Sequence, residues 1–338
     1  MMPAQLDLPL IWAGIIAVGV IMYVIMDGFD LGIGILFPLA PDDRARDVMM
    51  GTVAPIWDGN ETWLILGGAA LFAAFPIAYA VLLPAFYLPL IVMLLALVFR
   101  GVAFEFRFKS RANRHWWDRA FAWGSMTATF AQGVVLGSFI QGVEVVDRAY
   151  AGSALAWLTP FSLFCGLALM AGYAMLGAGW LIGKTQGLLQ LWAYNRMRLA
   201  SLLTLAAVVV VSLWTPLIHS AIAARWFTWP NILYLSPVPL LVALVGWRLY
   251  LAINRRQHWT PFLLTLALFV LSYAGLAISL FPYVIPPGIT IWDAASPRSS
   301  QLFLLSGTVV ILPIILAYTG YSYWVFRGKV TPDTGYHH

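Results

Sequence analysis

The chain has few charged residues for its length. Only 10% of its 338 residues are Asp, Glu, Lys or Arg, whereas soluble domains carry about 25%. Hydrophobic residues make up 62%, and apolar runs of about twenty residues recur along the sequence. One such run could be a signal peptide, but a repeated series cannot. The composition therefore excludes a soluble globular domain and predicts an all-α, polytopic membrane protein.

Cysteine and histidine are also scarce. Cys165 is the only cysteine, which excludes an intramolecular disulfide and a cysteine-rich metal cluster, and we interpret it as a packing residue. A haem held by histidine needs an axial ligand inside the membrane. No two of the five histidines are placed to face each other within a helix bundle: they are His115, His219, His258, His337 and His338.

Motifs for nucleotide binding and catalysis are missing as well. The sequence has no Walker loop, no His-x-x-x-His pair and no Ser/His/Asp arrangement. We therefore assign no catalytic residue, no metal and no directly bound cofactor to this chain.

The apolar runs predict about nine transmembrane helices in a single integral membrane domain, residues 1–338. Each run is close to the twenty residues that a helix needs to cross roughly 30 Å of hydrocarbon. No segment between the runs is long enough for a soluble domain. The predicted spans are residues 8–38, 54–74, 78–107, 117–141, 157–183, 197–222, 232–253, 260–282 and 301–326.

The loops between these spans alternate between many and few basic residues. By the positive-inside rule, the loops rich in Lys and Arg are cytoplasmic. The N-terminus is then periplasmic and the C-terminus cytoplasmic, which requires an odd number of spans and agrees with nine. The net charge of +5 has the same origin, so no nucleic-acid partner is expected. The basic loops hold Arg44 and Arg46; Arg107, Lys109, Arg111, Arg114 and Arg119; Lys184, Arg196 and Arg198; Arg248, Arg255 and Arg256; and Arg327 and Lys329.

Acidic residues inside the apolar spans are the strongest functional signal. An ionised carboxylate at the bilayer centre costs roughly 2.5–3.5 kcal/mol on insertion scales, so it needs a partner, a wet cavity or a proton. Asp27 and Asp30 lie three residues apart near the cytoplasmic end of the first span, and Asp58 and Glu61 have the same spacing in the second. Glu105 falls near the cytoplasmic end of the third. The orientation of the spans thus predicts that five acids from three consecutive helices lie at one depth.

Two interpretations of these acids are open from the residues alone. Crowded carboxylates with water between them share protons, which suits a proton relay. Alternatively, side chains near helix ends reach the interface at little cost, and Arg100 in the third span forms a structural ion pair with a carboxylate. We expect Asp58 to lie deeper than the others, surrounded by Trp57, Asn60 and Trp63.

Glycines accompany the acids in the first two spans. Small residues let helices approach closely in a membrane. We expect this role for Gly28, Gly32 and Gly34 in the first span, and for Gly59, Gly67 and Gly68 in the second.

Several motifs together closely resemble subunit II of the cytochrome bd-type quinol oxidases, including their cyanide-insensitive branch. The similarity extends from about residue 8 to 330. The motifs are Asp-Gly-Phe-Asp-Leu-Gly-Ile-Gly at 27–34, Trp-Asp-Gly-Asn-Glu-Thr-Trp at 57–63, Gly-Ala-Ala-Leu-Phe-Ala-Ala-Phe-Pro at 68–76, Phe-Arg-Gly-Val-Ala-Phe-Glu-Phe-Arg at 99–107, Phe-Pro-Tyr-Val-Ile-Pro at 281–286, Trp-Asp-Ala at 292–294 and Pro-Ile-Ile-Leu-Ala-Tyr-Thr at 313–319.

The resemblance implies a haem-free, nine-helix subunit of the bacterial inner membrane. Its expected partner is a similar subunit I, which holds two b-type haems and either a d-type or a third b-type haem. The complex would oxidise ubiquinol at the outer face and reduce dioxygen to water with protons from the cytoplasm. Small single-helix subunits and membrane lipid are further partners that such a complex admits, and subunit II of some members also holds a structural ubiquinone.

The resemblance also assigns expected roles to individual residues. Asp58 matches a carboxylate in a water-filled path from the cytoplasm, and Glu105 matches a position where some members have Asp. Trp63 matches a tryptophan near a proposed oxygen path, and we place Trp57 at the same path and subunit interface. With the residue-level reasoning above, the expected proton pathway is Asp58, Glu105, Asp27, Asp30 and Glu61, with Arg100 in structural ion pairs.

The sequence therefore predicts the accessory subunit of a terminal quinol oxidase. Two alternatives stand against this hypothesis. A proton-coupled secondary transporter would place its site at the membrane midplane on broken helices, often within inverted repeats. A purely structural partner would only stabilise subunit I, and its acids would serve no proton transfer.

Overall fold

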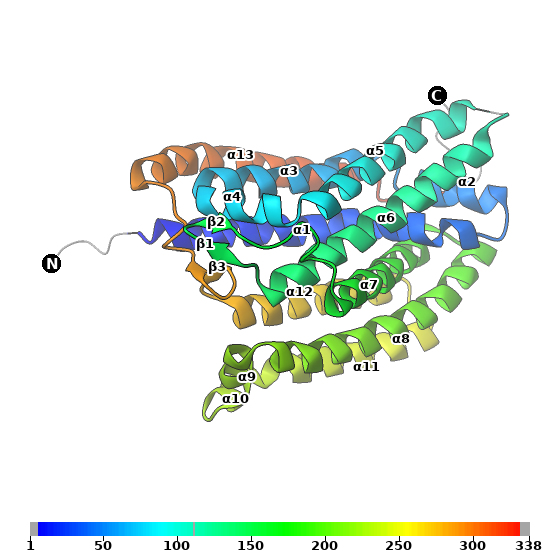
Figure 1. The fold of residues 1–338 in the computed structure, drawn as a ribbon. Coiled ribbons are helices and arrows are strands. Elements are labelled where there is room, and N and C mark those ends of the chain that lie inside the picture. Colours follow the sequence, from blue (N-terminus) through cyan, green and yellow to red (C-terminus); the bar gives the residue numbers. More distant parts are fainter. Residues whose placement is uncertain (1–5, 111, 332–338) are drawn as a thin grey trace.

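The computed structural model describes residues 6–110 and 112–331, so Arg111, His337 and His338 lie outside the described residues. Most of the chain is helical (Figure 1). The first half contains α1 (Leu8–Leu36), the 3₁₀ turn η1 (Phe37–Leu39), α2 (Asp43–Gly51), α3 (Trp57–Ala74), α4 (Pro76–Ala85), α5 (Tyr87–Lys109) and α6 (Arg114–Gln141). The second half contains α7 (Pro160–Lys184), α8 (Gly187–Ile218), α9 (Ser220–Phe227), α10 (Asn231–Leu235), α11 (Pro237–Asn254), α12 (Thr260–Leu280) and α13 (Arg298–Val325).

Two short antiparallel hairpins complete the fold. β1 (Val145–Val146) pairs with β2 (Ala149–Tyr150), and β3 (Tyr283–Ile285) pairs with β4 (Ile289–Thr290). In the second hairpin, Thr290 donates hydrogen bonds to Asp293 from its hydroxyl (2.5 Å) and its backbone N–H (3.2 Å), which hold the pKa of that exposed carboxyl below its usual value.

Seven helices within residues 6–110 and 112–331 are long and apolar enough to cross a membrane. They start at Leu8, Tyr87, Pro160, Gly187, Asn231, Thr260 and Arg298. Helices α3 and α6 occupy two further predicted spans but are not counted among the seven. The structure therefore supports a polytopic, all-α membrane protein.

The predicted span 78–107 differs from the structure because two helices cover it. α4 ends at Ala85, Phe86 separates the two, and α5 begins at Tyr87. Proline has no N–H and its ring clashes with the carbonyl four residues earlier. Pro89 stands four residues after Ala85, so it disfavours a continuous helix at this place, although α8 and α13 continue through Pro216 and Pro313.

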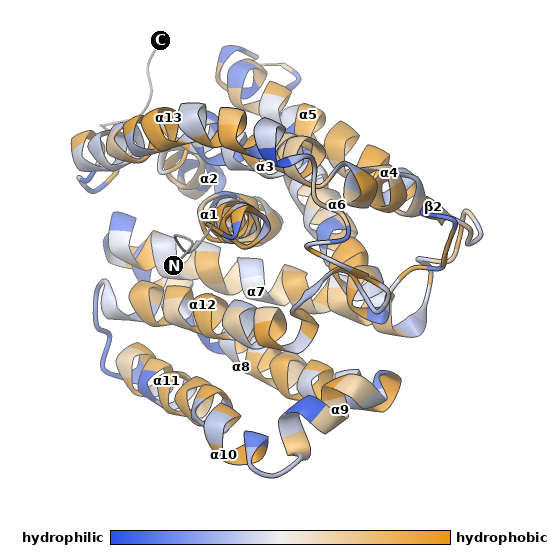
Figure 2. Ribbon diagram, turned by 90° about the vertical axis from the view of Figure 1, so that its left-hand side faces the viewer, coloured by the Kyte–Doolittle hydropathy of each residue, from blue (hydrophilic) through white to orange (hydrophobic). Residues whose placement is uncertain are grey.

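Helix α1 is the central element of the bundle. It packs against α3, α6 and α7, and touches α12 and α13 (Figure 2). Helices α8 and α11 lie outside α7 and α12, farther from α1 (Figures 1 and 2). The second half of α1 is enclosed, with residues 26–34 all buried, and this is the setting of the site described below.

Glycines on α1 permit this enclosure. A Cβ at Gly32 would overlap the carbonyl of Tyr173 on α7, and one at Gly34 would overlap the hydroxyl of Ser125 on α6. A Cβ at Gly28 would lie 2.9 Å from the ring of Tyr173. The predicted close approach is thus confirmed for these three glycines.

The glycines of α3 do not have this role within the described chain. A Cβ at Gly59 or Gly68 would meet no described atom within 4 Å, and one at Gly67 would make an ordinary contact with Val20 at 3.7 Å. The expectation of close packing at Gly59 and Gly68 is therefore wrong for contacts inside this chain, because they face outward from α3.

Helix α13 is hydrogen-bonded to the rest of the described chain near its two ends, while Leu312 and Ile315 in its middle pack against Tyr23, Met26 and Trp63. No residue in its most apolar stretch is buried by the described part of the chain. At its first turn, the indole of Trp12 donates to the carbonyl of Gln301 (3.2 Å). At its far end, the ammonium of Lys184 donates to the carbonyls of Phe326 and Gly328, and the N–H of Val330 donates to the carbonyl of Lys184 (2.9 Å).

We predict that Gly32→Ala destabilises the protein strongly, because the new methyl group would displace the α7 backbone. Overpacking of a tight core costs about 1–3 kcal/mol or more when backbone must move. The matched control is Gly14→Ala on the same helix, where an added Cβ meets no described atom within 4 Å. Melting temperatures of the purified protein measure the effect, and equal values for the two variants would contradict it.

Candidate functional site

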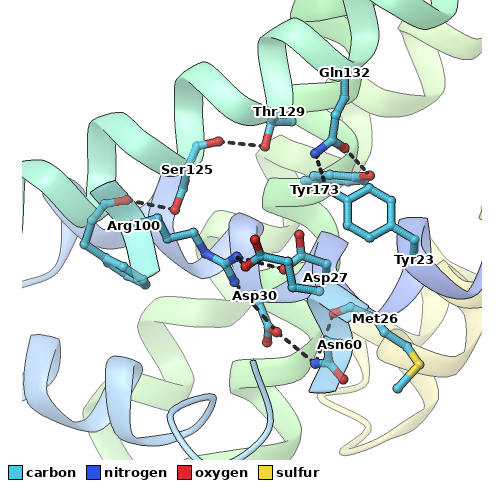
Figure 3. A network of polar contacts seen from close by, with 12 residues as sticks. Tyr23, Met26, Asp27, Asp30, Asn60, Arg100, Ser125, Thr129, Gln132 and Tyr173 are labelled. Atoms are coloured by element: carbon cyan, nitrogen blue, oxygen red, sulfur yellow. Dashed lines mark hydrogen bonds and ion pairs between the residues drawn. The ribbon is translucent and has the colours of Figure 1, made fainter. Parts of the chain in front are cut away.

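A buried group of charges lies where α1, α3 and α5 meet. The Arg100 guanidinium of α5 is fully buried, as are the carboxylates of Asp27 and Asp30 on α1. Arg100 Nη1 lies 2.9 Å from Asp27 Oδ1 and 3.4 Å from Glu61 Oε2 of α3, and its Nη2 lies 3.8 Å from Asp30 Oδ2 (Figure 3). We call Asp27, Asp30, Glu61 and Arg100 the charge cluster.

Local sequence explains how these side chains meet. Asp27 and Asp30 share one face of α1 because they are three residues apart. Close packing of α6 on α5 at Gly124 leaves little space beside Arg100, since a Cβ there would lie 2.7 Å from the carbonyl of Ala96. The rings of Trp57 and Phe104 lie 6.0 and 5.8 Å from the guanidinium carbon and favour its charge.

The charges of the cluster do not balance when every group is ionised. Three carboxylates face one guanidinium, and burying an uncompensated charge is costly. Asp27 Oδ1 and Oδ2, Asp30 Oδ1, and Arg100 Nε and Nη2 have no hydrogen-bond partner among the described residues. The arrangement is therefore suited to holding protons or water, and interacting carboxyls of this kind titrate as a group.

Neutral polar side chains extend the cluster on two sides. The Asn60 amide donates to Asp30 Oδ2 (2.8 Å), and its oxygen accepts from the Tyr323 hydroxyl of α13 (2.8 Å). One turn from Asp27, the Tyr23 hydroxyl accepts from the Gln132 amide (2.6 Å), whose oxygen accepts from the Tyr173 hydroxyl (2.9 Å) (Figure 3). Helices α6, α7 and α13 thus also contribute to the site.

The cluster borders a cavity on the surface between α3 and α5. This cavity of about 330 Å³ is lined by Trp57, Asp58, Glu61, Thr62, Ile65, Leu97, Val98, Gly101 and Val102, and we call it the α3–α5 groove. Glu61 belongs to both the groove and the charge cluster. Its side chain is 26% exposed, lines the groove and also faces Arg100. The groove thus opens onto the charge cluster through Glu61.

Asp58 is not enclosed by Trp57, Asn60 and Trp63 within the described chain, contrary to expectation. Its side chain is exposed in the groove, whereas Asp27 and Asp30 are fully buried. The reason is the rotation of α3: Asn60, two residues on, faces α1, and Asp58 therefore faces away from it. Of its expected neighbours, Trp57 also lines the groove, while Asn60 and Trp63 are buried.

Glu105 does not join the charge cluster, contrary to expectation. It is exposed and pairs with Lys109 at 3.2 Å, one turn further along α5. It follows Val102 by three residues and Gly101 by four, so it lies on the groove face of α5, nearer the C-terminal end of the helix. Three of the five acids therefore meet around Arg100, and two lie along the groove.

Trp63 lies behind the groove rather than in its lining. It is 2% exposed and packs with Tyr23 and Met26, and its indole N–H has no hydrogen-bond partner among the described residues. Trp57 stacks on Phe104 with ring centroids 4.8 Å apart.

Several polar residues of the site were not found by sequence reasoning. Tyr23 precedes Asp27 by four residues, and this spacing could have indicated it. No such spacing in the sequence indicates the other three polar residues, because they lie in helices far from Asp27 along the chain: Gln132, Tyr173 and Tyr323. A second buried arginine, Arg107, was interpreted as a loop residue, yet it contacts Asp47 (2.7 Å) and Asp118 (2.5 Å) and joins α2, α5 and α6.

The histidines of the described chain do not fit an axial haem site inside the bundle. His219 lies at the end of α8 and contacts the carbonyl of Ile140 (2.8 Å). His258 follows α11 and lies 3.2 Å from Gln190, and His115 lies in the first turn of α6. No group of three His, Cys, Asp or Glu side chains suited to a metal is found in the described ranges.

The fold and the charge cluster define a multi-span membrane protein with a polar centre between its first helices. A family model described as cytochrome bd terminal oxidase subunit II matches residues 8–326. The chain belongs to this family, and the resemblance inferred from its motifs is confirmed.

Individual relatives agree with this assignment over nearly the whole chain. Cytochrome bd-I ubiquinol oxidase subunit 2 of Escherichia coli K12 is 31% identical and is matched over 96% of this chain and 95% of its own length. Cytochrome bd ubiquinol oxidase subunit 2 of Bacillus subtilis is 30% identical, over 95% and 96%. A chain of the bd oxidase from Geobacillus thermodenitrificans shares the fold, with a TM-score of 0.76 at 16% identity, over 95% of this chain and 99% of that one.

We predict that Arg100→Met destabilises the protein by about 3–5 kcal/mol, because two fully buried carboxylates would lose their cation. The matched control is Lys109→Met, which removes a cation from an exposed pair on the same helix and should cost no more than about 1 kcal/mol. Denaturant unfolding of the purified protein in detergent gives both values. A cost for Arg100→Met as small as the control's would show that the buried pairs are not the main contacts of this site.

Proposed function

We propose that the chain is the haem-free subunit II of a terminal quinol oxidase in the bacterial inner membrane. Its partner is a haem-bearing subunit I, and the complex oxidises ubiquinol and reduces dioxygen to water. Membership in the family supports this, as do relatives named as ubiquinol oxidase subunits at 30–31% identity. The haems, two b-type and one d- or b-type, belong to subunit I in this proposal, since the described histidines lie at helix ends. Small single-helix subunits, lipid and a structural ubiquinone are further components of the proposed complex.

The proposed topology has nine spans, with a periplasmic N-terminus and a cytoplasmic C-terminus. The spans are α1, α3, α4 with α5, α6, α7, α8, α11, α12 and α13. The start of α1 and the end of α13 lie at opposite ends of the bundle (Figure 1), which supports an odd number of crossings. The basic residues beside α2 and the α5–α6 connection lie at the end assigned to the cytoplasm.

The α3–α5 groove is the proposed proton path. Glu105 lies at its cytoplasmic side, Asp58 and Glu61 line it, and Asp27 and Asp30 stand behind Glu61 as supporting carboxyls. The observation that carries the proposal is the double position of Glu61, which is open to the groove and within 3.4 Å of the buried Arg100. Protons entering along the groove can thus exchange with a charge cluster that has more carboxylates than cations.

The groove also marks the face that subunit I would cover. Its exposed lining, together with the uncovered α13, presents apolar side chains around two acids that would otherwise face lipid. Trp57 lies in this face, and Trp63 lies directly behind it. We assign both to the interface and the oxygen path, as the family resemblance implies.

We predict that Asp58→Leu slows oxygen reduction by the assembled complex, because the leucine cannot carry a proton along the groove. Loss of one proton-transfer group typically reduces a rate by about 10²–10⁴-fold when that transfer limits turnover. The matched control is Asp43→Asn, an exposed acid on α2 whose ion pair within the described ranges is with Arg46. Oxygen consumption is measured with the haem content fixed by the visible spectrum.

Normal turnover at full haem content in Asp58→Leu would refute the proton path. If Glu61→Gln and Glu105→Gln were equally active, the alternative of a purely structural partner would hold instead. Arg100 would then act only as the ion-pair residue that joins α1, α3 and α5.

A further inference from the structure

Helix α13 reaches the charge cluster through a single hydroxyl group. Much of α13 is uncovered, yet Tyr323 is half-buried. Its ring packs edge-on against the stacked rings of Phe29 and Trp180, with ring centroids 6.4 and 6.0 Å away. Its hydroxyl donates to Asn60 Oδ1 at 2.8 Å. The last helix of the chain is thus hydrogen-bonded to a residue that itself contacts Asp30.

Asn60 can link Tyr323 to Asp30 because its side-chain amide has an acceptor oxygen at one end and a donor nitrogen at the other. Its side chain is 1% exposed, so it is closed off from bulk solvent. The nitrogen donates to Asp30 Oδ2 at 2.8 Å and lies 3.5 Å from the carbonyl of Met26. Because the Tyr323 hydroxyl donates to the amide oxygen of Asn60, that oxygen must face Tyr323. The amide nitrogen of Asn60 is then held on the side of Asp30, where it can donate.

The orientation of this amide matters because Asp30 lies in a group with excess negative charge. A hydrogen bond donated to a carboxylate favours its ionised form, and the effect is larger where the site is buried. Beyond Asp27 lie Tyr23, Gln132 and Tyr173, which complete the polar surroundings (Figure 3). The groups that face Asp30 are the Asp27 carboxylate of α1, the Asn60 amide and Glu61 carboxylate of α3, the Arg100 guanidinium of α5 and the Tyr323 hydroxyl of α13.

We propose that Tyr323 is a positioning residue: by orienting Asn60, it sets the proton affinity of the Asp30 carboxyl and links the charge cluster to the position of α13. The inference deepens the proposed proton path and rests on it for its role in turnover. Any movement of the inner end of α13 changes the Tyr323–Asn60 distance. By linkage, a change in the protonation of the cluster in turn favours one position of the helix.

Tyr323→Phe separates this role from packing, because the ring contacts with Phe29 and Trp180 are kept and only the hydroxyl is lost. Tyr321→Phe is the matched control, since Tyr321 is on the same helix, is 61% exposed and stacks on Trp324. Both variants are studied in the assembled oxidase, with haem content as the measure of assembly.

The primary measurement is the pH titration of the buried aspartic acids by infrared difference spectroscopy. Isotope labelling of aspartate separates their C=O bands from those of Glu61 and Glu105, and Asp30→Asn identifies the band of Asp30. We expect the midpoint of the Asp30 band to move by about 0.5–1 pH unit in Tyr323→Phe, the size of one ordinary net hydrogen bond between neutral groups. The midpoint in Tyr321→Phe should stay at the wild-type value. The pH profile of oxygen reduction should show the same pattern and serves as the second measurement where Asp30→Asn does not assemble.

Two results would overturn the proposal. One is an aspartic-acid titration and a pH profile that are both unchanged in Tyr323→Phe. The other is loss of haem content in that variant with no change in the titration of what assembles, which would make the hydroxyl a structural contact only. The infrared midpoint does not depend on turnover. It therefore tests the role of Tyr323 even if Asp58→Leu and Glu61→Gln leave oxygen reduction unchanged, which would refute the proton path alone.

Discussion

The buried guanidinium of Arg100 is the interaction on which the arrangement of the first helices depends. A cation without water is stable only beside compensating negative charge, and here the carboxylates come from α1 and α3 while the arginine comes from α5. Each of the three helices is therefore fixed in rotation as well as in position. Because the carboxylates outnumber the cation, the same contacts that join the helices also leave sites for exchangeable protons. A structural ion pair and a proton site are thus compatible interpretations of one cluster.

Close packing around α1 makes this cluster possible. Gly32 faces the backbone of α7 and Gly34 faces Ser125 of α6, so α1 lies deep between these helices. That depth buries Asp27 and Asp30 completely, whereas α3 and α5 are covered on one side only and leave Asp58 exposed. The contrast between a buried inner pair and an exposed outer acid follows from the order in which the helices surround α1.

Much of the fold was predictable from the sequence, and the site only in part. Composition and periodic apolar runs are sufficient for a polytopic helical protein, and three-residue spacing with alternating orientation places Asp27, Asp30 and Glu61 at one depth. The rotation of each helix about its axis was not predictable, so the exposure of Asp58 and the separate position of Glu105 were missed. The break at Phe86 could have been inferred from Pro89. Tyr323 could not, because contact between α3 and α13 is decided by the packing of the whole bundle.

The contact between Tyr323 and Asn60 also has a consequence for how the protein is made. The two residues are separated by 263 positions. A chain emerging from the ribosome inserts α3 long before α13 is made, so during synthesis Asn60 lacks the hydroxyl that later donates to its amide oxygen. The hydrogen bonds of Asn60 are therefore complete only when α13 has packed beside α3.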